Sequence, residues 1–163
     1  MEGLQNIIES NGVTLSQKLK NYLRIFTYPP KGYEFGISQD GWVLIEESDI
    51  LIVFWDSNNF IGLLKTLEIP HFTLKSIIDN KMQEYKINES YFDQVFPIKG
   101  MTITAFNMES DYWSNLSIEF LLTANILVED LKIVFKSKIS EKWVGQKLKH
   151  KMKKYIYLTS NGA

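Results

Sequence analysis

The sequence predicts one α+β domain over residues 1–163, with a mainly antiparallel central sheet packed by N-terminal, middle and C-terminal helices. The composition supports a folded domain, because 45% of the residues are hydrophobic, 13% aromatic and 23% charged. Segments with the apolar spacing of helices flank segments rich in β-branched and aromatic residues. No internal repeat and no Ser-, Gly- or Pro-rich linker divides the chain.

The first part of the chain predicts two short helices. Apolar residues recur at helical spacing over residues 4–8, before Asn11-Gly12, which is a helix stop. Residues 14–17 have the form of a capping box, and the apolar residues that follow share one helical face: Leu15, Leu19, Tyr22, Leu23 and Phe26. Residues 28–32 end this second helix, because proline donates no backbone hydrogen bond.

Four segments before residue 107 predict strands of the sheet. Residues 33–38 and 42–46 flank Gln39-Asp40-Gly41, and an Asp-Gly pair suits a tight hairpin turn. Residues 50–55 are β-branched and aromatic on both faces, which predicts a central strand covered on each side in the middle of the sheet. Residues 101–106 alternate with their threonines outward, which predicts a strand with one solvated face.

The middle of the chain predicts one long helix and two shorter features. Residues 60–69 fit either a strand or a helix, and Pro70 ends them in both cases. From Thr73 to about Lys86 the apolar residues recur at helical spacing, which predicts a helix. Residues 91–96 predict a short turn of helix before Pro97.

The last third predicts a helix, a strand and a final helix. Residues 113–136 combine helical spacing in their first part with strand character at residues 126–128 and 133–135, so we expect a helix followed by a strand. The final helix is expected to begin at Ser140 as N-cap and to end near Tyr157.

Charge is unevenly distributed along the chain. The segment from residue 136 to 154 holds one acid, Glu141, and eight lysines at positions 136, 138, 142, 147, 149, 151, 153 and 154, for a net charge of about +7. The other 144 residues hold 10 basic and 18 acidic side chains, a net charge of −8. The near-neutral total of −1 therefore hides a strong asymmetry.

The final helix predicts a buried stripe and a basic outer side. Val144, Leu148, Met152 and Tyr155 share the stripe that should face the core. Trp143, Lys147, His150 and Lys154 stand at i, i+4, i+7 and i+11 on the outer side, which suits a contact surface for an anionic lipid, protein or RNA. The alternative is that Trp143 packs under a neighbouring loop while the lysines only solvate the helix. Nucleic acid is an unlikely partner, because the rest of the chain would repel phosphates.

Two acidic groups are candidate partner-binding residues. Glu46, Glu47 and Asp49 follow the predicted hairpin, and Glu109, Asp111, Tyr112 and Trp113 combine carboxylates with rings in a predicted exposed loop. Acids raise the association rate with a basic protein, and rings supply contact area. The alternative for the second group is that its rings enter the core and its acids only mark a turn.

The chain shows no recognisable catalytic or cofactor motif. It has no cysteine and only two histidines, no phosphate-binding glycine loop and no nucleophile elbow. His71, just before the predicted helix from Thr73, could act as a general base, and the alternative is a hydrogen-bonded structural histidine. We therefore expect a protein that is not an enzyme and that binds no metal or cofactor.

The sequence also predicts a cytoplasmic protein. The absence of cysteine fits a reducing compartment, and the first residues have no basic side chain and no apolar stretch of a signal peptide. The longest apolar run is residues 50–55, whereas a helical membrane span needs about 20 residues.

In size, lack of cysteine and acidic body, the chain resembles bacterial immunity proteins, which neutralise secreted toxins. The resemblance is one of overall type, and its basic last helix departs from the uniformly acidic surface of many such inhibitors. It implies a small inhibitor that covers a basic, nuclease-like toxin with an acidic, ring-bearing face. The other functions considered are an enzyme of unrecognised family that uses His71, and a membrane- or RNA-associated module that uses the final helix.

Overall fold

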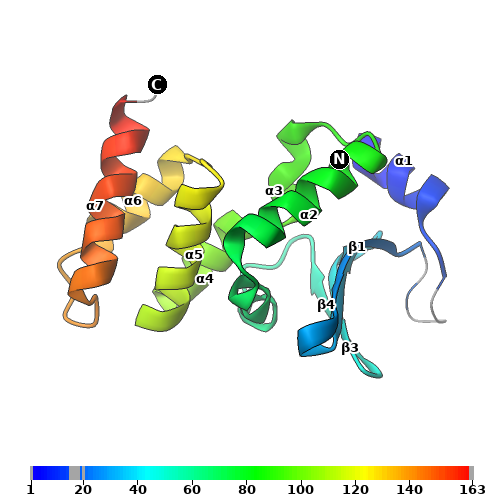
Figure 1. Ribbon diagram of the computed structural model, residues 1–163, viewed down its shortest axis with the longest axis horizontal. Helices are drawn as coiled ribbons and strands as arrows, with labels where there is room; N and C mark the ends of the chain where they lie inside the picture. Colours follow the sequence, from blue (N-terminus) through cyan, green and yellow to red (C-terminus); the bar gives the residue numbers. More distant parts are fainter. Residues whose placement is uncertain (1, 15–18, 20, 162–163) are drawn as a thin grey trace. The chain divides into compact units, whose positions relative to one another are not determined.

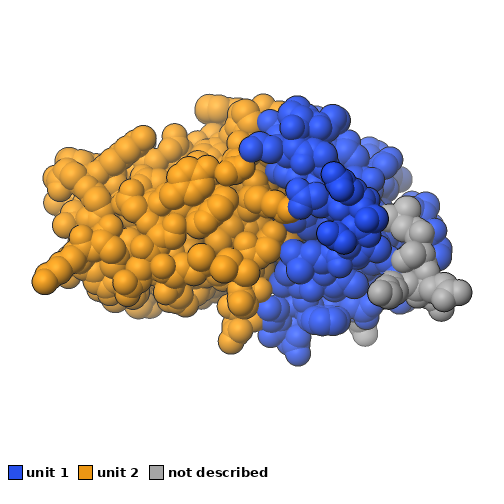
Figure 2. Space-filling model, turned by 90° about the horizontal axis from the view of Figure 1, so that it is seen from below, with its two compact units in different colours: residues 1–57, 74–97 blue, residues 58–73, 98–163 orange. Residues whose placement is uncertain are grey.

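A computed structural model describes residues 2–14, 19 and 21–161 of the chain. The chain forms two compact units, which Figure 2 shows in blue and orange. Unit 1 comprises residues 1–57 and 74–97, and unit 2 comprises residues 58–73 and 98–163. The predicted α+β class is confirmed, and the assignment of the whole chain to one domain stays a prediction.

Unit 1 is built on a four-stranded antiparallel sheet in the order β1-β2-β3-β4. Its strands are β1 (Leu23–Tyr28), β2 (Tyr33–Ile37), β3 (Gly41–Glu46) and β4 (Asp49–Phe54). The predicted β2–β3 hairpin is confirmed, and Gly41 at its turn has a φ of 158°, where an added Cβ would lie 2.1 Å from the Val53 carbonyl oxygen. Each strand pairs with its neighbour in sequence, so the sheet is a simple meander.

The second predicted helix is wrong where the structure describes it. Leu23 to Phe26 belong to β1, which pairs with β2 and has a register shift between Arg24 and Phe26. The shift explains the misreading, because a bulge breaks the strict alternation of a strand and leaves Ile25 and Phe26 both buried. The predicted capping box includes residues 15–17, which lie outside the described residues.

The strand over residues 50–55 exists, but its predicted central place is wrong, because β4 ends the sheet. Its two faces are apolar because each is partly covered. Ile50 and Ile52 are half-buried against the cluster of Leu19, Tyr22 and Val43, and Val53 is buried on the opposite face. Partial cover of both faces therefore produces the same sequence pattern as a central strand.

The helical parts of unit 1 follow the predictions more closely. The first and third helices are confirmed as α1 (Glu2–Asn11) and α2 (His71–Glu84), although α2 starts within the segment assigned to unit 2. Unit 1 also contains the short helices η1 (Pro29–Lys31), η3 (Glu89–Tyr91) and α3 (Phe92–Val95). The ring of Phe96, which directly follows α3, meets Phe35 of β2 edge-on at a centroid distance of 5.5 Å.

All of the regular secondary structure in the described part of unit 2 is helical (Figure 1). Its elements are η2 (Ile61–Glu68), α4 (Ile98–Asn107), α5 (Asp111–Thr123), α6 (Glu129–Lys138) and α7 (Gln146–Asn161). Helix α7 lies beside α5 and α6, and α4 lies beside α5. The core is aromatic, since Phe135 lies 4.9 Å from both Phe106 and Tyr155, measured between ring centroids.

Two predicted strands are instead helices of unit 2. Residues 101–106 lie in α4, where Thr102 is fully buried and donates its hydroxyl to the Ile98 carbonyl oxygen at 2.8 Å. A threonine that satisfies its hydroxyl within its own helix can be buried, so the polar–apolar alternation did not mark a solvated face. The other predicted strand is also wrong: residues 126–128 have no regular structure, and residues 133–135 lie in α6, with Leu131 and Phe135 buried one helical turn apart.

The final helix starts later than predicted. Ser140 does not cap it, because residues 140–145 form turns and α7 begins at Gln146. The predicted buried stripe is confirmed, since Leu148, Met152 and Tyr155 are fully buried and Val144, just before the helix, is 3% exposed. The Tyr155 hydroxyl accepts a hydrogen bond of 2.7 Å from the Val128 backbone N–H, which ties α7 to the start of α6.

Candidate protein-binding surfaces

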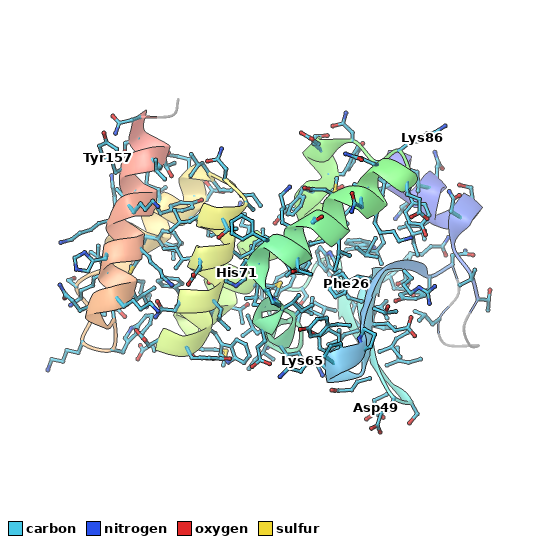
Figure 3. All side chains as sticks on the ribbon, viewed as in Figure 1. Phe26, Asp49, Lys65, His71, Lys86 and Tyr157 are labelled. Atoms are coloured by element: carbon cyan, nitrogen blue, oxygen red, sulfur yellow. The ribbon has the colours of Figure 1, made fainter. Side chains whose placement is uncertain are left out.

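The first acidic group lies at the turn between β3 and β4. Glu46 and Asp49 are paired residues that close the hairpin, and Glu47 and Ser48 form its tip. All four side chains are exposed, and Figure 3 labels Asp49 at this end of the sheet. Glu47 has a φ of 54°, a conformation that a residue other than glycine or asparagine adopts at a cost. The turn thus holds three carboxylates within four exposed residues.

Exposed apolar side chains accompany these acids along β4. Leu51 is 40% exposed and Phe54 is 58% exposed. Among the described residues β4 pairs only with β3, so its outer edge has backbone groups directed away from the sheet. We call Glu47, Asp49, Leu51 and Phe54 the hairpin surface; Leu51 and Phe54 lie on opposite faces of β4, on either side of its open edge. Sequence reasoning missed its apolar half, because β4 was expected to be buried on both faces.

Two tryptophans hold the hairpin in place. The Trp42 Nε1–H donates to the Gln94 carbonyl oxygen at 2.8 Å, and the Trp55 Nε1–H donates to the Gln39 carbonyl oxygen at 2.7 Å. Their rings meet edge-on with centroids 4.6 Å apart. Both tryptophans lie at the end of the β3–β4 pair opposite the 46–49 turn, so they anchor the base of the hairpin.

The second acidic group lies in unit 2, and most of its side chains already form contacts within that unit. Only Glu109, with a φ of 53°, lies in the expected exposed loop; Asp111 to Trp113 form the first turn of α5. Asp111 Oδ1 accepts from the Gly145 backbone N–H at 3.0 Å, and Oδ2 accepts from Asn115 at 3.0 Å. The predicted loop is therefore wrong over residues 111–113, where Ser110 acts as helix cap.

The two rings of this group have structural partners as well. The Tyr112 hydroxyl donates to Glu68 Oε1 at 2.9 Å, although the residue is 55% exposed. Trp113 is half-buried, and its ring meets that of Tyr112 edge-on at 4.7 Å. Because the two acidic groups belong to different units, each is a separate candidate surface.

Trp143 does not lie on the outer side of the final helix. It precedes α7, is half-buried and meets the Phe106 ring edge-on with centroids 5.8 Å apart. Its Nε1–H donates to Glu141 Oε2 at 2.5 Å, and this bond, followed by one from Lys138, lowers the pKa of the Glu141 carboxyl. The predicted line of four residues is thus wrong at Trp143, whereas Lys147, His150 and Lys154 are exposed on α7 as expected.

The lysines of the basic segment divide into paired and unpaired groups. Lys151 forms an ion pair with Glu119 of α5, and Lys138 lies 3.1 Å from a Glu141 carboxylate oxygen. The hydrogen bond from Lys151 is the main cause that lowers the pKa of Glu119. Within the described residues, no carboxylate lies in ion-pair range of the remaining lysines, at positions 136, 142, 147, 149, 153 and 154.

The charge asymmetry follows the two units. Unit 1 contains 12 acidic and seven basic residues, a net charge of −5, and unit 2 contains seven acidic and 11 basic residues, a net charge of +4. The hairpin surface is in the acidic unit and α7 is in the basic unit. The hairpin surface and α7 thus each lie in the unit whose net charge matches their own, whereas the acidic group at residues 109–113 lies in the basic unit.

His71 occupies a structural position at the start of α2. It is half-buried, its Nε2 lies 3.3 Å from the Leu67 carbonyl oxygen, and its ring meets Phe120 edge-on at 6.0 Å. Burial lowers its pKa, partly offset by the bond to Leu67 and by the charge of Glu119. The adjacent hollow of about 350 Å³ is lined by Glu119, Lys151 and Lys154 among others but not by His71. This hollow therefore does not support the enzyme hypothesis.

No protein-family model, curated protein or solved structure matches this chain. Over the described ranges, no helix combines the length and apolar character that crossing a membrane requires. In that same part of the chain, no group of three histidine, aspartate or glutamate side chains is arranged to hold a metal ion.

Proposed function

We propose that this chain is a cytoplasmic protein-binding inhibitor, of the immunity-protein type, that captures a basic protein with the hairpin surface of unit 1. The observation that supports this most directly is the combination of Glu47 and Asp49 with the exposed Leu51 and Phe54 on an edge strand. Carboxylates raise the rate of encounter with a cationic partner, and desolvated apolar side chains slow dissociation. The partner class is a basic, nuclease-like toxin.

The edge of β4 suggests the form of the complex. An exposed strand edge can accept an extended partner segment as a further strand, with backbone hydrogen bonds giving affinity and alternate side chains giving specificity. A basic segment beside β4 would place cations near Glu47 and Asp49 and apolar groups near Leu51 and Phe54. Unit 1, with its net charge of −5, would attract such a partner over longer distances.

The first test is co-expression with the protein encoded by the adjacent gene, which this proposal expects to be basic. The wild-type chain should co-purify with it, and the variant Glu47→Lys/Asp49→Lys should bind it about tenfold more weakly. The matched control is Glu84→Lys/Glu89→Lys, which makes the same change in charge at exposed residues of unit 1. Equal weakening in both variants would reject the hairpin as the site.

The apolar half of the surface has its own test. Phe54→Ser should raise the dissociation rate about tenfold and leave the association rate unchanged, because a desolvated apolar ring contributes to the bound state only. Phe72→Ser is the control, since Phe72 is 80% exposed but lies in unit 2. An unchanged dissociation rate in Phe54→Ser would show that β4 is not covered by the partner.

A second candidate function is attachment of α7 to an anionic membrane surface. It is favoured by one observation: Lys147 and Lys154 are exposed, and no carboxylate of the described residues pairs with them. Lys147→Glu/Lys154→Glu should abolish sedimentation with vesicles that contain about 30% phosphatidylserine. Lys136→Glu/Lys142→Glu makes the same charge change outside α7, so equal loss in both variants would exclude a site on the helix.

A further inference from the structure

Unit 1 contains a hollow of about 210 Å³ that is lined by polar side chains and by the apolar Val13. Tyr22 and Arg24 from the β1 region, Glu34 of β2 and Lys81 of α2 line it, together with Tyr85 just after α2. A second hollow of about 360 Å³ shares Arg24 and Lys81 with the first. All of these residues belong to unit 1, so one compact body forms the site.

The Tyr22 hydroxyl is the unusual group in this hollow. The residue is 1% exposed, and its hydroxyl oxygen is buried without a hydrogen-bond partner among the described residues. A buried hydroxyl with no partner is unfavourable, since it loses its bonds to water and gains none. Because Tyr22 is one of the residues that line the hollow, a ligand or an ordered water there is the group available to complete its hydroxyl.

Gly36 sets the position of the Tyr22 ring. An added Cβ at Gly36 would lie 2.4 Å from the ring and 2.4 Å from the Leu23 carbonyl oxygen. Glycine at this place in β2 therefore lets the ring lie directly against the sheet. The hydroxyl is held in place by backbone packing, which makes it a pre-positioned donor.

Two cations share the hollow with this hydroxyl. The Arg24 guanidinium lies 3.4 Å from Glu34 Oε2, at the outer limit of a hydrogen bond, so its donors are weakly engaged. Lys81 Nζ lies 2.6 Å from Glu84 Oε2 and 5.2 Å from the Tyr85 ring centroid. Burial first, and then the charge of Glu34, raise the pKa of the Tyr22 hydroxyl far above its ordinary value, so it stays protonated and can donate.

We propose that this hollow binds a small molecule through a carboxylate or phosphate group, with the Tyr22 hydroxyl as donor and Arg24 and Lys81 as counter-charges. Arg24 exchanges its long contact with Glu34 for the incoming oxyanion. Charge-assisted bonds of this kind are shorter and stronger than neutral ones. Because unit 1 is net acidic, its overall field gives anions no general attraction, and binding depends on these residues. The site is independent of the hairpin surface and of the proposed partner.

The test is an NMR titration with inorganic phosphate and with acetate, against sodium chloride at the same ionic strength. The wild-type chain should show saturable shifts confined to the Tyr22 ring and the Arg24 side chain. Tyr22→Phe keeps the ring and removes only the hydroxyl, and it should weaken binding about tenfold. Arg24→Gln, at a side chain that is 59% exposed, should do the same without affecting the fold.

Lys86→Gln is the matched control, because Lys86 is exposed beyond the end of α2 and does not line the hollow (Figure 3). It should bind both anions as the wild-type chain does. Phosphate alone saturating the site identifies a phosphate-bearing ligand, and both anions saturating it identifies oxyanion recognition in general. The proposal is wrong if the shifts match those in chloride or persist in Tyr22→Phe. In that case no anion binds the Tyr22 hydroxyl, and only water is its partner.

Discussion

At the scale of single residues, His71 shows how burial decides protonation. Its ring lies between the Leu67 carbonyl oxygen and the Phe120 ring, and loss of water lowers its pKa. The imidazole of His71 is therefore neutral near pH 7. His150 on α7, by contrast, is exposed to solvent. A histidine in this position stabilises the start of α2 by packing in its neutral form.

This protonation state makes stability depend on pH. A base whose pKa is lowered in the folded state binds fewer protons there than in the unfolded chain, so the free energy of unfolding should fall as the pH drops below about 6.5. One proton limits the slope to about 1.4 kcal/mol per pH unit. Urea unfolding at a series of pH values should show this loss in wild type and in His150→Gln, and its absence in His71→Gln. Identical profiles in the two variants would contradict the assignment.

At the scale of elements, the sequence predicts periodic segments well and bulged or back-bonded segments poorly. The helix from Thr73 and the Asp-Gly hairpin follow from spacing and turn chemistry, and both are present. Residues 101–106 were misread because Thr102 bonds to its own helix, and β1 was misread because of its bulge. These features depend on tertiary burial and pairing, which a period in the sequence does not encode.

Gly36 provides a test of the packing between the sheet and Tyr22. In an ordinary strand, alanine in place of glycine raises stability by about 0.5–1 kcal/mol, because the unfolded chain loses less entropy on folding. Here the new Cβ meets the Leu23 carbonyl oxygen and the Tyr22 ring at 2.4 Å, so Gly36→Ala should lower stability by about 1–3 kcal/mol. Chemical denaturation measures the difference, and a stabilised variant would show that the ring does not lie against β2.

At the scale of the whole molecule, the charge separation predicted from the sequence is retained, with its boundary moved. The sequence separates a basic last helix from an acidic remainder, whereas the folded chain separates an acidic unit 1 from a basic unit 2. Of the described carboxylates, only Glu119 and Glu141 form ion pairs with the lysine-rich segment. Most of the positive charges of this segment are therefore not neutralised by a described carboxylate. The division of the chain into two units could not be predicted from the sequence, because unit 2 combines two separate segments, residues 58–73 and residues 98–163.

The candidate site was only half predictable for a related reason. Glu46, Glu47 and Asp49 stand out as an acidic turn in the sequence, and the structure places all three in solvent. Leu51 and Phe54 did not, because exposure at a sheet edge depends on strand order rather than on local sequence. Trp143 shows the reverse, because it packs against Phe106 within unit 2 and is half-buried. Asp111 is exposed as expected, but its carboxylate is hydrogen-bonded to Gly145 and Asn115.

The most direct test of the hairpin surface is the association rate constant with the basic protein encoded by the adjacent gene, measured by stopped flow from low to high salt. Steering by Glu47 and Asp49 predicts a wild-type rate that falls steeply with added salt, and a Glu47→Lys/Asp49→Lys rate that starts about tenfold lower and changes little. The two rates should converge at high salt. Equal rates for both proteins at low salt would contradict the account.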